Sequence, residues 1–506
     1  MPTAHFGILT YLIVRRITEP IIAQCAYFVG CPRTRKAILV DPVRDSARYI
    51  TIADEIGITI SAILETHDPS DYISGVCEML SAHATHAYIS GETDPPHWYA
   101  RDSSLWQRRV TFLKDGSTFT IGDLQARAIL TPGHAAGALS ISIEHQASGL
   151  HILLTGDALL PGGAGRTTAE DACELRESLQ RFATFPDHTI ILAGHLSGSA
   201  CGRAINLPGE TTLGIERRFN PVLRAIESAD GFAAATCDNQ PERPAYFSRM
   251  EQLHHGEKPA LMKELPATTP ELDHDTFLQY VSFPRTVVID TRPWHEFTYD
   301  GVVGALHVPF DRFFAPLIGS GVANDERVVC ICERSKILDI VRTLRLVGID
   351  RIDGWISSSS YASIDRELIP LSEVDDISQH AAHEMYVRGE CLMLDVRTTA
   401  EWLRGRIAGA KLTTLTQIAE HIELIPRDRF VIAYCAAGGR SSRACAYLNR
   451  HGIECATLKG GYWPWFGRDF PVEGADRPIS IATDTATEWW DARNRAREIE
   501  PEKSSP

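Results

Sequence analysis

The sequence predicts an α/β protein built from several layered units. Short apolar runs typical of buried strands alternate with helical stretches over residues 1–225, and a second pattern repeats with a period of about 105 residues between 271 and 480. With 506 residues, 44% of them hydrophobic, the chain is long enough to bury several cores. We therefore expect three folded units, with a connecting arm between the first and the second.

In residues 1–225 the strand-like runs are followed directly by polar residues. The runs cover residues 37–41, 62–65, 151–155 and 189–193, and a helical stretch covers residues 48–56. Functional side chains often gather at strand ends, so a site is expected there. The polar stretches are Thr66-His67-Asp68-Pro69, Thr131-Pro132-Gly133-His134, Thr155-Gly156-Asp157 and Ala193-Gly194-His195.

These four stretches resemble the metallo-β-lactamase fold, and more closely its persulfide dioxygenase branch, in which that domain is fused to rhodanese domains. Supporting motifs are Leu39-Val40-Asp41-Pro42, Gly163-Ala164-Gly165-Arg166-Thr167, Ser199-Ala200-Cys201-Gly202 and Glu216-Arg217-Arg218-Phe219-Asn220. The resemblance implies an N-terminal metallo-β-lactamase-like αββα sandwich over residues 1–225, followed by two rhodanese-like α/β domains. It also implies one iron per chain and a contact between Arg166 and the glutathione carboxylate.

In that branch two histidines and one aspartate hold the iron, a ligand face that leaves room for a thiolate substrate and dioxygen. The matching positions here hold Pro69, His134 and Asp157. Because proline offers no ligand atom, we expect an impaired metal site unless His67 or Asp68 completes it. A metal-free domain in which His134 and Asp157 form a hydrogen-bonded pair is the alternative.

Hydrolase relatives of this fold carry a second metal, which requires a histidine at the position of Tyr72. The resemblance therefore argues against a two-metal hydrolase.

Residues 226–270 have the composition of a connecting arm, with several Pro, His, Glu and Lys residues close together. Tyr246 and Phe247 interrupt this polar stretch, and we expect them to dock on a neighbouring domain.

Residues 271–370 and 371–480, here the first and second repeats, are two copies of one pattern. We interpret them as tandem rhodanese-like domains, each with an internal hydrogen-bonded anchor formed by an Asp-x-Arg pair. Both copies run to a strand that ends in a cysteine. The matching residues are Asp290 and Asp395, Arg292 and Arg397, Glu296 and Glu401, and Cys332 and Cys435.

The second repeat presents a complete set of parts for a chemical step. Cys435 follows the apolar run 430–434 and precedes a helical pattern over 443–451. A loop of small residues between a strand and a helix can turn its N–H groups inward and stabilise a thiolate or a persulfide. The predicted cradle consists of Ala436, Ala437, Gly438, Gly439 and Ser441.

This loop resembles the active-site loop of the rhodanese sulfurtransferases. The resemblance implies that Cys435 is the catalytic nucleophile and that Arg440 holds the anionic group of the sulfur donor. A buried, inert cysteine is the alternative interpretation.

The first repeat departs from this pattern at its cysteine. The loop after Cys332 contains no glycine, and Glu333 places an acid beside the thiol, where it would repel a persulfide. We expect the first repeat to be inactive and to serve as a spacer and docking surface.

The composition excludes some classes of partner. A formal charge of -15 argues against nucleic acid and against an anionic membrane, and no apolar stretch reaches transmembrane length. The 12 cysteines lack the dense spacing of a secreted scaffold, which favours a cytoplasmic protein. A homodimer is an option that the resemblance leaves open, and the tail 481–506 has no assigned role.

Together these observations predict a sulfur-metabolism enzyme. Cys435 would transfer sulfane sulfur from thiosulfate or a low-molecular-weight persulfide, such as glutathione persulfide, to a small thiol. The N-terminal domain would be persulfide dioxygenase-like, with an impaired metal site. Two alternatives stay open: a functional iron-dependent persulfide dioxygenase that converts glutathione persulfide to sulfite with a rearranged ligand set, and a non-catalytic thiol-binding scaffold.

Overall fold

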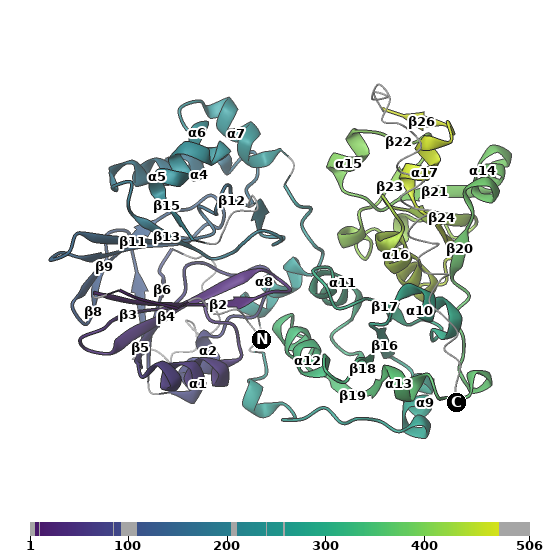
Figure 1. Cartoon of the computed structure of the whole chain (residues 1–506), viewed down its shortest axis with the longest axis horizontal. Helices are drawn as coiled ribbons and strands as arrows, with labels where there is room; N and C mark the ends of the chain where they lie inside the picture. The colour runs from purple at the N-terminus through teal and green to yellow at the C-terminus, as the bar shows by residue number, and fades with distance from the viewer. Residues whose placement is uncertain are drawn as a thin grey trace, which may run out of the picture. The chain divides into compact units, whose positions relative to one another are not determined.

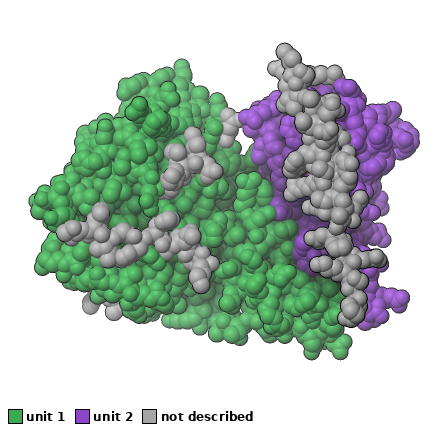
Figure 2. Space-filling model, in the orientation of Figure 1, with its two compact units in different colours: residues 1–291, 308–364 green, residues 292–307, 365–506 purple. Residues whose placement is uncertain are grey.

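The computed structural model describes residues 6–9, 11–83, 85–92, 109–203, 210–238, 240–256 and 259–474. The chain divides into two compact units, residues 1–291 with 308–364 and residues 292–307 with 365–506 (Figure 2). The tail 481–506 lies outside the described residues. Among those that are described, no helix combines the length and apolar character needed to cross a membrane.

The first unit begins with two sheets packed face to face, here called the N-terminal sandwich. Helices α1 (Ser46–Ile56) and α2 (Val76–Ala82) cover the outer face of the first sheet, and α4 (Ala172–Gln180) and α7 (Ala229–Cys237) cover the second (Figure 1). The predicted αββα sandwich is therefore confirmed.

The first sheet has the order β1 to β7, and the second has the order β15-β13-β11-β10-β9-β8. Strands of the first sheet are β1 (Phe6–Leu9), β2 (Leu12–Glu19), β3 (Gln24–Cys31), β4 (Lys36–Val40), β5 (Thr59–Leu64), β6 (His86–Ser90) and β7 (Val110–Leu113). Strands of the second are β8 (Thr118–Ile121), β9 (Leu124–Leu130), β10 (Leu139–His145), β11 (Leu150–Gly156), β13 (Ile190–Ala193) and β15 (Thr211–Thr212).

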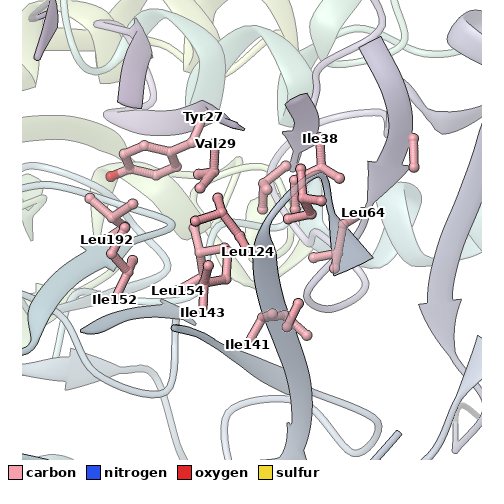
Figure 3. Packing of buried hydrophobic residues seen from close by; sticks show 14 of the residues in the cluster. Tyr27, Val29, Ile38, Leu64, Leu124, Ile141, Ile143, Ile152, Leu154 and Leu192 are labelled. Carbon is pink, nitrogen blue, oxygen red and sulfur yellow. The ribbon is translucent and has the colours of Figure 1, made fainter. Parts of the chain in front are cut away.

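Alternating residues of the facing strands fill the space between the two sheets (Figure 3). The first sheet contributes Tyr27, Val29, Ile38 and Leu64, and the second contributes Ile141, Ile143, Ile152, Leu154 and Leu192, all buried. The Tyr27 hydroxyl also donates to the carbonyl of Ala193 at 2.8 Å. This hydrogen bond fixes the end of β13, the strand that leads to His195.

The first repeat contributes three parallel strands to the first unit, β16 (Thr286–Asp290), β18 (Arg327–Cys332) and β19 (Ile352–Ser357). Its helices in this unit include α9 (His274–Ser282), α11 (Phe314–Gly321) and α12 (Ile337–Leu346). The predicted strand that ends in Cys332 is thus present. Residues 292–307 of this repeat belong to the second unit.

The connecting arm carries α8 (Phe247–His255), which contacts both the N-terminal sandwich and the first repeat within the first unit, through His254 to the N–H of Ser74 and through Arg249 to the carbonyls of Val322 and Gly348. Tyr246 and Phe247 are both buried, and the Tyr246 hydroxyl donates to the carbonyl of Asp71 at 3.1 Å. On the other side, the Tyr246 N–H donates to the Ser320 hydroxyl at 3.2 Å. The docking role predicted for Tyr246 and Phe247 is therefore confirmed.

The second repeat forms a parallel sheet of five strands in the order β20-β25-β24-β21-β23. The strands are β20 (Asp375–Ile377), β21 (Cys391–Asp395), β23 (Lys411–Leu412), β24 (Phe430–Tyr434) and β25 (Cys455–Leu458). The helices include α14 (Gln379–Arg388), α15 (Thr399–Leu403), α16 (Gly439–Arg450) and α17 (Tyr462–Gly467). Strand β24 coincides with the predicted run 430–434.

Helix α16 begins at Gly439, four residues before the predicted start at 443. Two adjacent glycines suggest a longer loop in the sequence, because glycine disfavours a helix interior. In the structure only the first of the two, Gly438, has a positive φ, +105°, and the helix starts directly after it. The first-turn N–H groups of α16 therefore lie close to Cys435.

Candidate functional sites

The Cys435 sulfur lies in a cradle of hydrogen-bond donors between β24 and α16. Its Sγ accepts from the N–H of Gly438 at 3.0 Å and from the N–H of Arg440 at 3.4 Å. The Ser441 hydroxyl lies 3.8 Å from the same sulfur, and the Cys435 side chain is buried. A sulfur at the start of a helix, facing backbone N–H groups, is well placed to carry negative charge.

The other residues of the predicted cradle shape the loop. Ala437 and Gly439 are exposed at its open side, while the Ala436 carbonyl accepts from the N–H of Trp463 at 3.5 Å. The Cys435 carbonyl accepts from the N–H of Tyr462 at 2.7 Å. These two contacts attach the loop to the start of α17.

Gly461, just before α17, is required by this close approach. It has a φ of +70°, and a Cβ at this position would lie 2.3 Å from the Cys435 carbonyl oxygen. Gly460 and Gly461 stand directly before an aromatic run, and adjacent glycines in such a place are a sequence signal for this kind of contact.

The Arg440 side chain, for which the resemblance implies a contact with the donor, forms an ion pair with Glu401 in the structure. Its Nη1 and Nη2 donate to the two carboxylate oxygens of Glu401, on α15, at 2.6 and 2.7 Å. Burial opposes ionisation of Glu401, but the hydrogen bonds from Arg440 and Thr398 outweigh it and lower the pKa of Glu401 to about 2. Glu401 thus belongs to the Cys435 site. In the sequence it is recognisable only as a residue that recurs in both repeats.

The Asp-x-Arg anchor of the second repeat is present. Arg397 donates from Nε to Asp395 Oδ1 at 2.9 Å and from Nη2 to Oδ2 at 2.6 Å, and its guanidinium carbon lies 4.2 Å from the centre of the Tyr462 ring. In the first repeat Arg292 is hydrogen-bonded to Asp300 at 2.8 Å.

Cys332, the matching cysteine of the first repeat, has a different environment. Burial, followed by the charges of Glu333 and Asp290, raises the pKa of the Cys332 thiol to about 12. A neutral thiol is a poor nucleophile, which agrees with the expected inactivity of this repeat.

A second candidate site lies at the strand ends of the N-terminal sandwich. His67 follows β5, His134 follows β9, and Asp157 follows β11. The Nε2 atoms of His67 and His134 lie 3.8 and 3.5 Å from Asp157 Oδ2, and one potential ligand atom from each residue lies within 4.8 Å of the other two. All three side chains are largely buried.

His67 thus takes the place beside His134 and Asp157 that the resemblance assigns to the position of Pro69. Asp68, the other residue considered for this role, is engaged elsewhere, since its Oδ2 lies 2.9 Å from Nε2 of His255.

Hydrogen bonds orient both histidines toward Asp157. The Thr66 hydroxyl donates to Asp41 at 2.8 Å and therefore accepts from Nδ1–H of His67, also at 2.8 Å. Nδ1–H of His134 donates to the carbonyl of Arg166 at 2.8 Å. Each Nε2 is left with its lone pair directed into the cluster, as a metal ligand requires. Burial lowers the pKa of His67 to about 4, which keeps this imidazole neutral.

His195 lies behind this cluster, between two carboxylates. Its Nδ1 is 2.8 Å from Asp157 Oδ2, and its Nε2 is 3.0 Å from Asp71 Oδ2. Burial opposes protonation, but the two carboxylates outweigh it and raise the pKa of His195. His195, Asp71 and Cys201 form a second buried group whose ligand atoms lie within 4.8 Å of one another.

Arg166 is tied to the protein. Its Nη2 donates to the carbonyl of Ala200 at 2.8 Å and also to the carbonyl of Pro241 in the connecting arm. The Arg166 guanidinium therefore links the loop that contains Ala200 to the segment of the connecting arm that contains Pro241.

Comparisons with known proteins match both regions. Residues 23–195 match the model of the metallo-β-lactamase superfamily, and residues 378–467 match the model of the rhodanese-like domain. A probable hydroxyacylglutathione hydrolase of Schizosaccharomyces pombe is 28% identical over 227 residues, covering 40% of this chain and 83% of the relative. A hydroxyacylglutathione hydrolase of Pseudomonas entomophila is 29% identical over 217 residues, covering 38% of this chain and 79% of the relative.

A solved structure supports the fold. A metallo-β-lactamase from Staphylococcus aureus aligns with a TM-score of 0.60 at 24% identity, covering 69% of this chain and 99% of the other. The chain therefore joins a domain of the metallo-β-lactamase superfamily to a C-terminal rhodanese-like domain.

Proposed function

We propose that this protein is a sulfurtransferase in which Cys435 carries sulfane sulfur as a persulfide. The observation that carries the proposal is the position of Sγ, which faces the N–H groups of Gly438 and Arg440 at the start of α16. The same donors that stabilise a thiolate also stabilise the negative charge of a persulfide. The match to the rhodanese-like model, which includes this loop, supports the same chemistry.

With thiosulfate as donor, the Cys435 thiolate attacks the outer sulfur. The new Cys S–S bond forms, the S–S bond of thiosulfate breaks, and sulfite leaves with the bonding electron pair. An acceptor thiolate or cyanide then attacks the outer sulfur of the persulfide, which forms a new persulfide or thiocyanate and returns Cys435 to the thiolate. Neither step needs an external oxidant or reductant.

The first repeat would not take part in this chemistry. Its Cys332 thiol remains neutral because the pKa is raised to about 12. We propose a structural role instead, since α12 ends against the loop that carries His67 and Asp71: the N–H of Ile73 donates to the carbonyl of Leu346 at 2.9 Å.

A second function, persulfide dioxygenation, is favoured by one specific observation, the convergence of His67, His134 and Asp157. The residues fit a metal because both Nε2 lone pairs and a carboxylate oxygen point to one place, with the opposite ring nitrogens held by hydrogen bonds. Bound iron would supply the redox chemistry by which a persulfide reacts with dioxygen. We propose His67, rather than position 69, as the third ligand.

For the substrate of the N-terminal domain we propose a glutathione persulfide. Two of the curated relatives that match this region are named as hydroxyacylglutathione hydrolases, which supports a glutathione-bearing substrate. The partly buried Arg166 would act by holding its loop and the arm in place.

Two experiments test these proposals. Thiosulfate:cyanide transfer should be abolished in Cys435→Ala and retained in Cys332→Ala, whereas equal losses would contradict the role of the cradle. No transfer by the unmodified protein would leave the non-catalytic scaffold as the better interpretation. Separately, metal content per chain, with oxygen uptake on glutathione persulfide, tests the N-terminal site. Metal-free protein without oxygen uptake would refute the dioxygenase function.

A further inference from the structure

Both terminal nitrogens of Arg440 are occupied by a carboxylate from the same unit. The distances to Glu401, 2.6 and 2.7 Å, are those of a two-pronged, charge-assisted pair. The Arg440 backbone N–H at the same time faces the Cys435 sulfur. The side chain best placed to attract an anionic donor is therefore already neutralised.

Contacts with Thr398, in addition to the pair with Arg440, hold the Glu401 side chain in position. Its Oε2 accepts from the N–H and from the hydroxyl of Thr398, each at 3.0 Å, and the Glu401 N–H donates back to the Thr398 hydroxyl at 3.2 Å. This capping box fixes the carboxylate at the first turn of α15. An incoming anion would have to compete with a carboxylate that is held in place from two sides.

The cradle itself does not depend on the guanidinium. Sγ is held by backbone N–H groups, which stay available whatever the Arg440 side chain binds. A donor that carries one negative charge near the transferred sulfur needs little more than these N–H groups. A dianionic donor such as thiosulfate brings a second charge, and the Arg440 guanidinium that could bind it is already paired with Glu401.

We propose that Glu401 is a specificity-determining residue that makes the Cys435 site favour singly charged sulfane-sulfur donors over dianionic thiosulfate. This inference rests on the proposed sulfurtransferase function. It identifies the preferred donors as organic persulfides and thiosulfonates, whose leaving sulfur is bonded to carbon.

The test compares two donors of the same reaction type, thiosulfate and methanethiosulfonate. In both, the Cys435 thiolate takes the outer sulfur as the S–S bond breaks, and the leaving groups are sulfite and methanesulfinate. The variant is Glu401→Gln, because glutamine retains the capping box but loses the charge. Glu473→Gln is the matched control, since Glu473 is also paired with an arginine, Arg406 at 3.0 Å, and accepts from the N–H of Gly409.

In the full-length protein, Glu401→Gln should lower the KM for thiosulfate by about tenfold, the effect of one charged hydrogen-bond pair released for the donor. The KM for methanethiosulfonate should change by less than about twofold. Glu473→Gln should leave the ratio of the two KM values unchanged.

The outcomes separate the two proposals. Turnover of both donors with the same KM ratio in Glu401→Gln as in the unmodified protein would overturn the specificity role alone. Absence of Cys435-dependent turnover with either donor would overturn the proposed function and this inference together.

Discussion

Gly438→Ala is the substitution that tests the cradle geometry most sharply. Gly438 has φ +105° and ψ -30°, a conformation that side chains other than glycine rarely adopt, and its N–H makes the 3.0 Å contact with Cys435 Sγ. Nothing lies within 4 Å of a Cβ added there, so the substitution introduces backbone strain without a steric clash. The neighbouring Gly439, at the first position of α16, has equally open space and no positive φ, which makes Gly439→Ala the matched control.

The expected magnitudes follow from this difference. Forcing alanine into the Gly438 conformation costs about 1–3 kcal/mol, so the loop should relax and turn its N–H away from Sγ. Loss of one hydrogen bond to a charged sulfur corresponds to about 1.5–3 kcal/mol, or about a 10- to 100-fold decrease in kcat/KM. Gly439→Ala should be neutral or stabilising by up to about 1 kcal/mol, because alanine is the better helix former.

Steady-state sulfurtransfer and denaturant unfolding of both variants, side by side, measure these effects. The reasoning predicts a large loss of kcat/KM in Gly438→Ala and a small change in Gly439→Ala. Equal activity in the two variants, or full activity of Gly438→Ala, would refute the assignment of the Gly438 N–H to the cradle.

Three further predictions concern the rest of the chain. Alkylation of Cys332 should be slow at pH 7, and its rate should rise about tenfold per pH unit without levelling off up to about pH 10, because its pKa is raised to about 12 and the small thiolate fraction grows in proportion. Mass spectrometry of the Cys332 peptide measures this rate, and a plateau at about pH 8–9 would contradict the raised pKa. Pro69→His should leave the iron content per chain unchanged, because His67 already completes the group with His134 and Asp157, and a rise in iron by elemental analysis would contradict the assignment of His67 as the third ligand. Tyr246→Phe should destabilise the protein by about 1–3 kcal/mol in denaturant unfolding, because it leaves the buried carbonyl of Asp71 without this hydrogen bond, and unchanged stability would show that the contact contributes nothing.

The features that depend on local sequence are predictable without the structure. Strand β24 is an uninterrupted apolar run, and the small residues after Cys435 can form little else than a tight loop before a helix. The predicted strands of the N-terminal sandwich likewise appear within a few residues of their expected limits, because each run is bounded by turn residues.

The partners of the site residues depend on distant contacts and could not be predicted in this way. Arg440 meets Glu401 because β21 and β24 pair in parallel, which places α15 beside the start of α16. His67 faces Asp157 because Thr66 is fixed by Asp41. Neither the contact between Arg440 and Glu401 nor the approach of His67 to Asp157 can be predicted from the spacing of these residues in the sequence.

The path of the loop after His67 has a similar origin. The Asp68 carboxylate pairs with His255, and the Asp71 carbonyl accepts from the Tyr246 hydroxyl. His255 and Tyr246 belong to the connecting arm. The composition of that arm indicates a linker, but its contacts contribute to the shape of the candidate metal site.

The most direct measurement of the central claim is peptide mass spectrometry after the full-length protein is incubated with thiosulfate and its unreacted thiols are blocked. We expect that the peptide containing Cys435 gains the mass of one sulfur atom, that cyanide removes it, and that the peptide containing Cys332 gains none. A sulfur adduct on Cys332, or no adduct on Cys435, would contradict this claim.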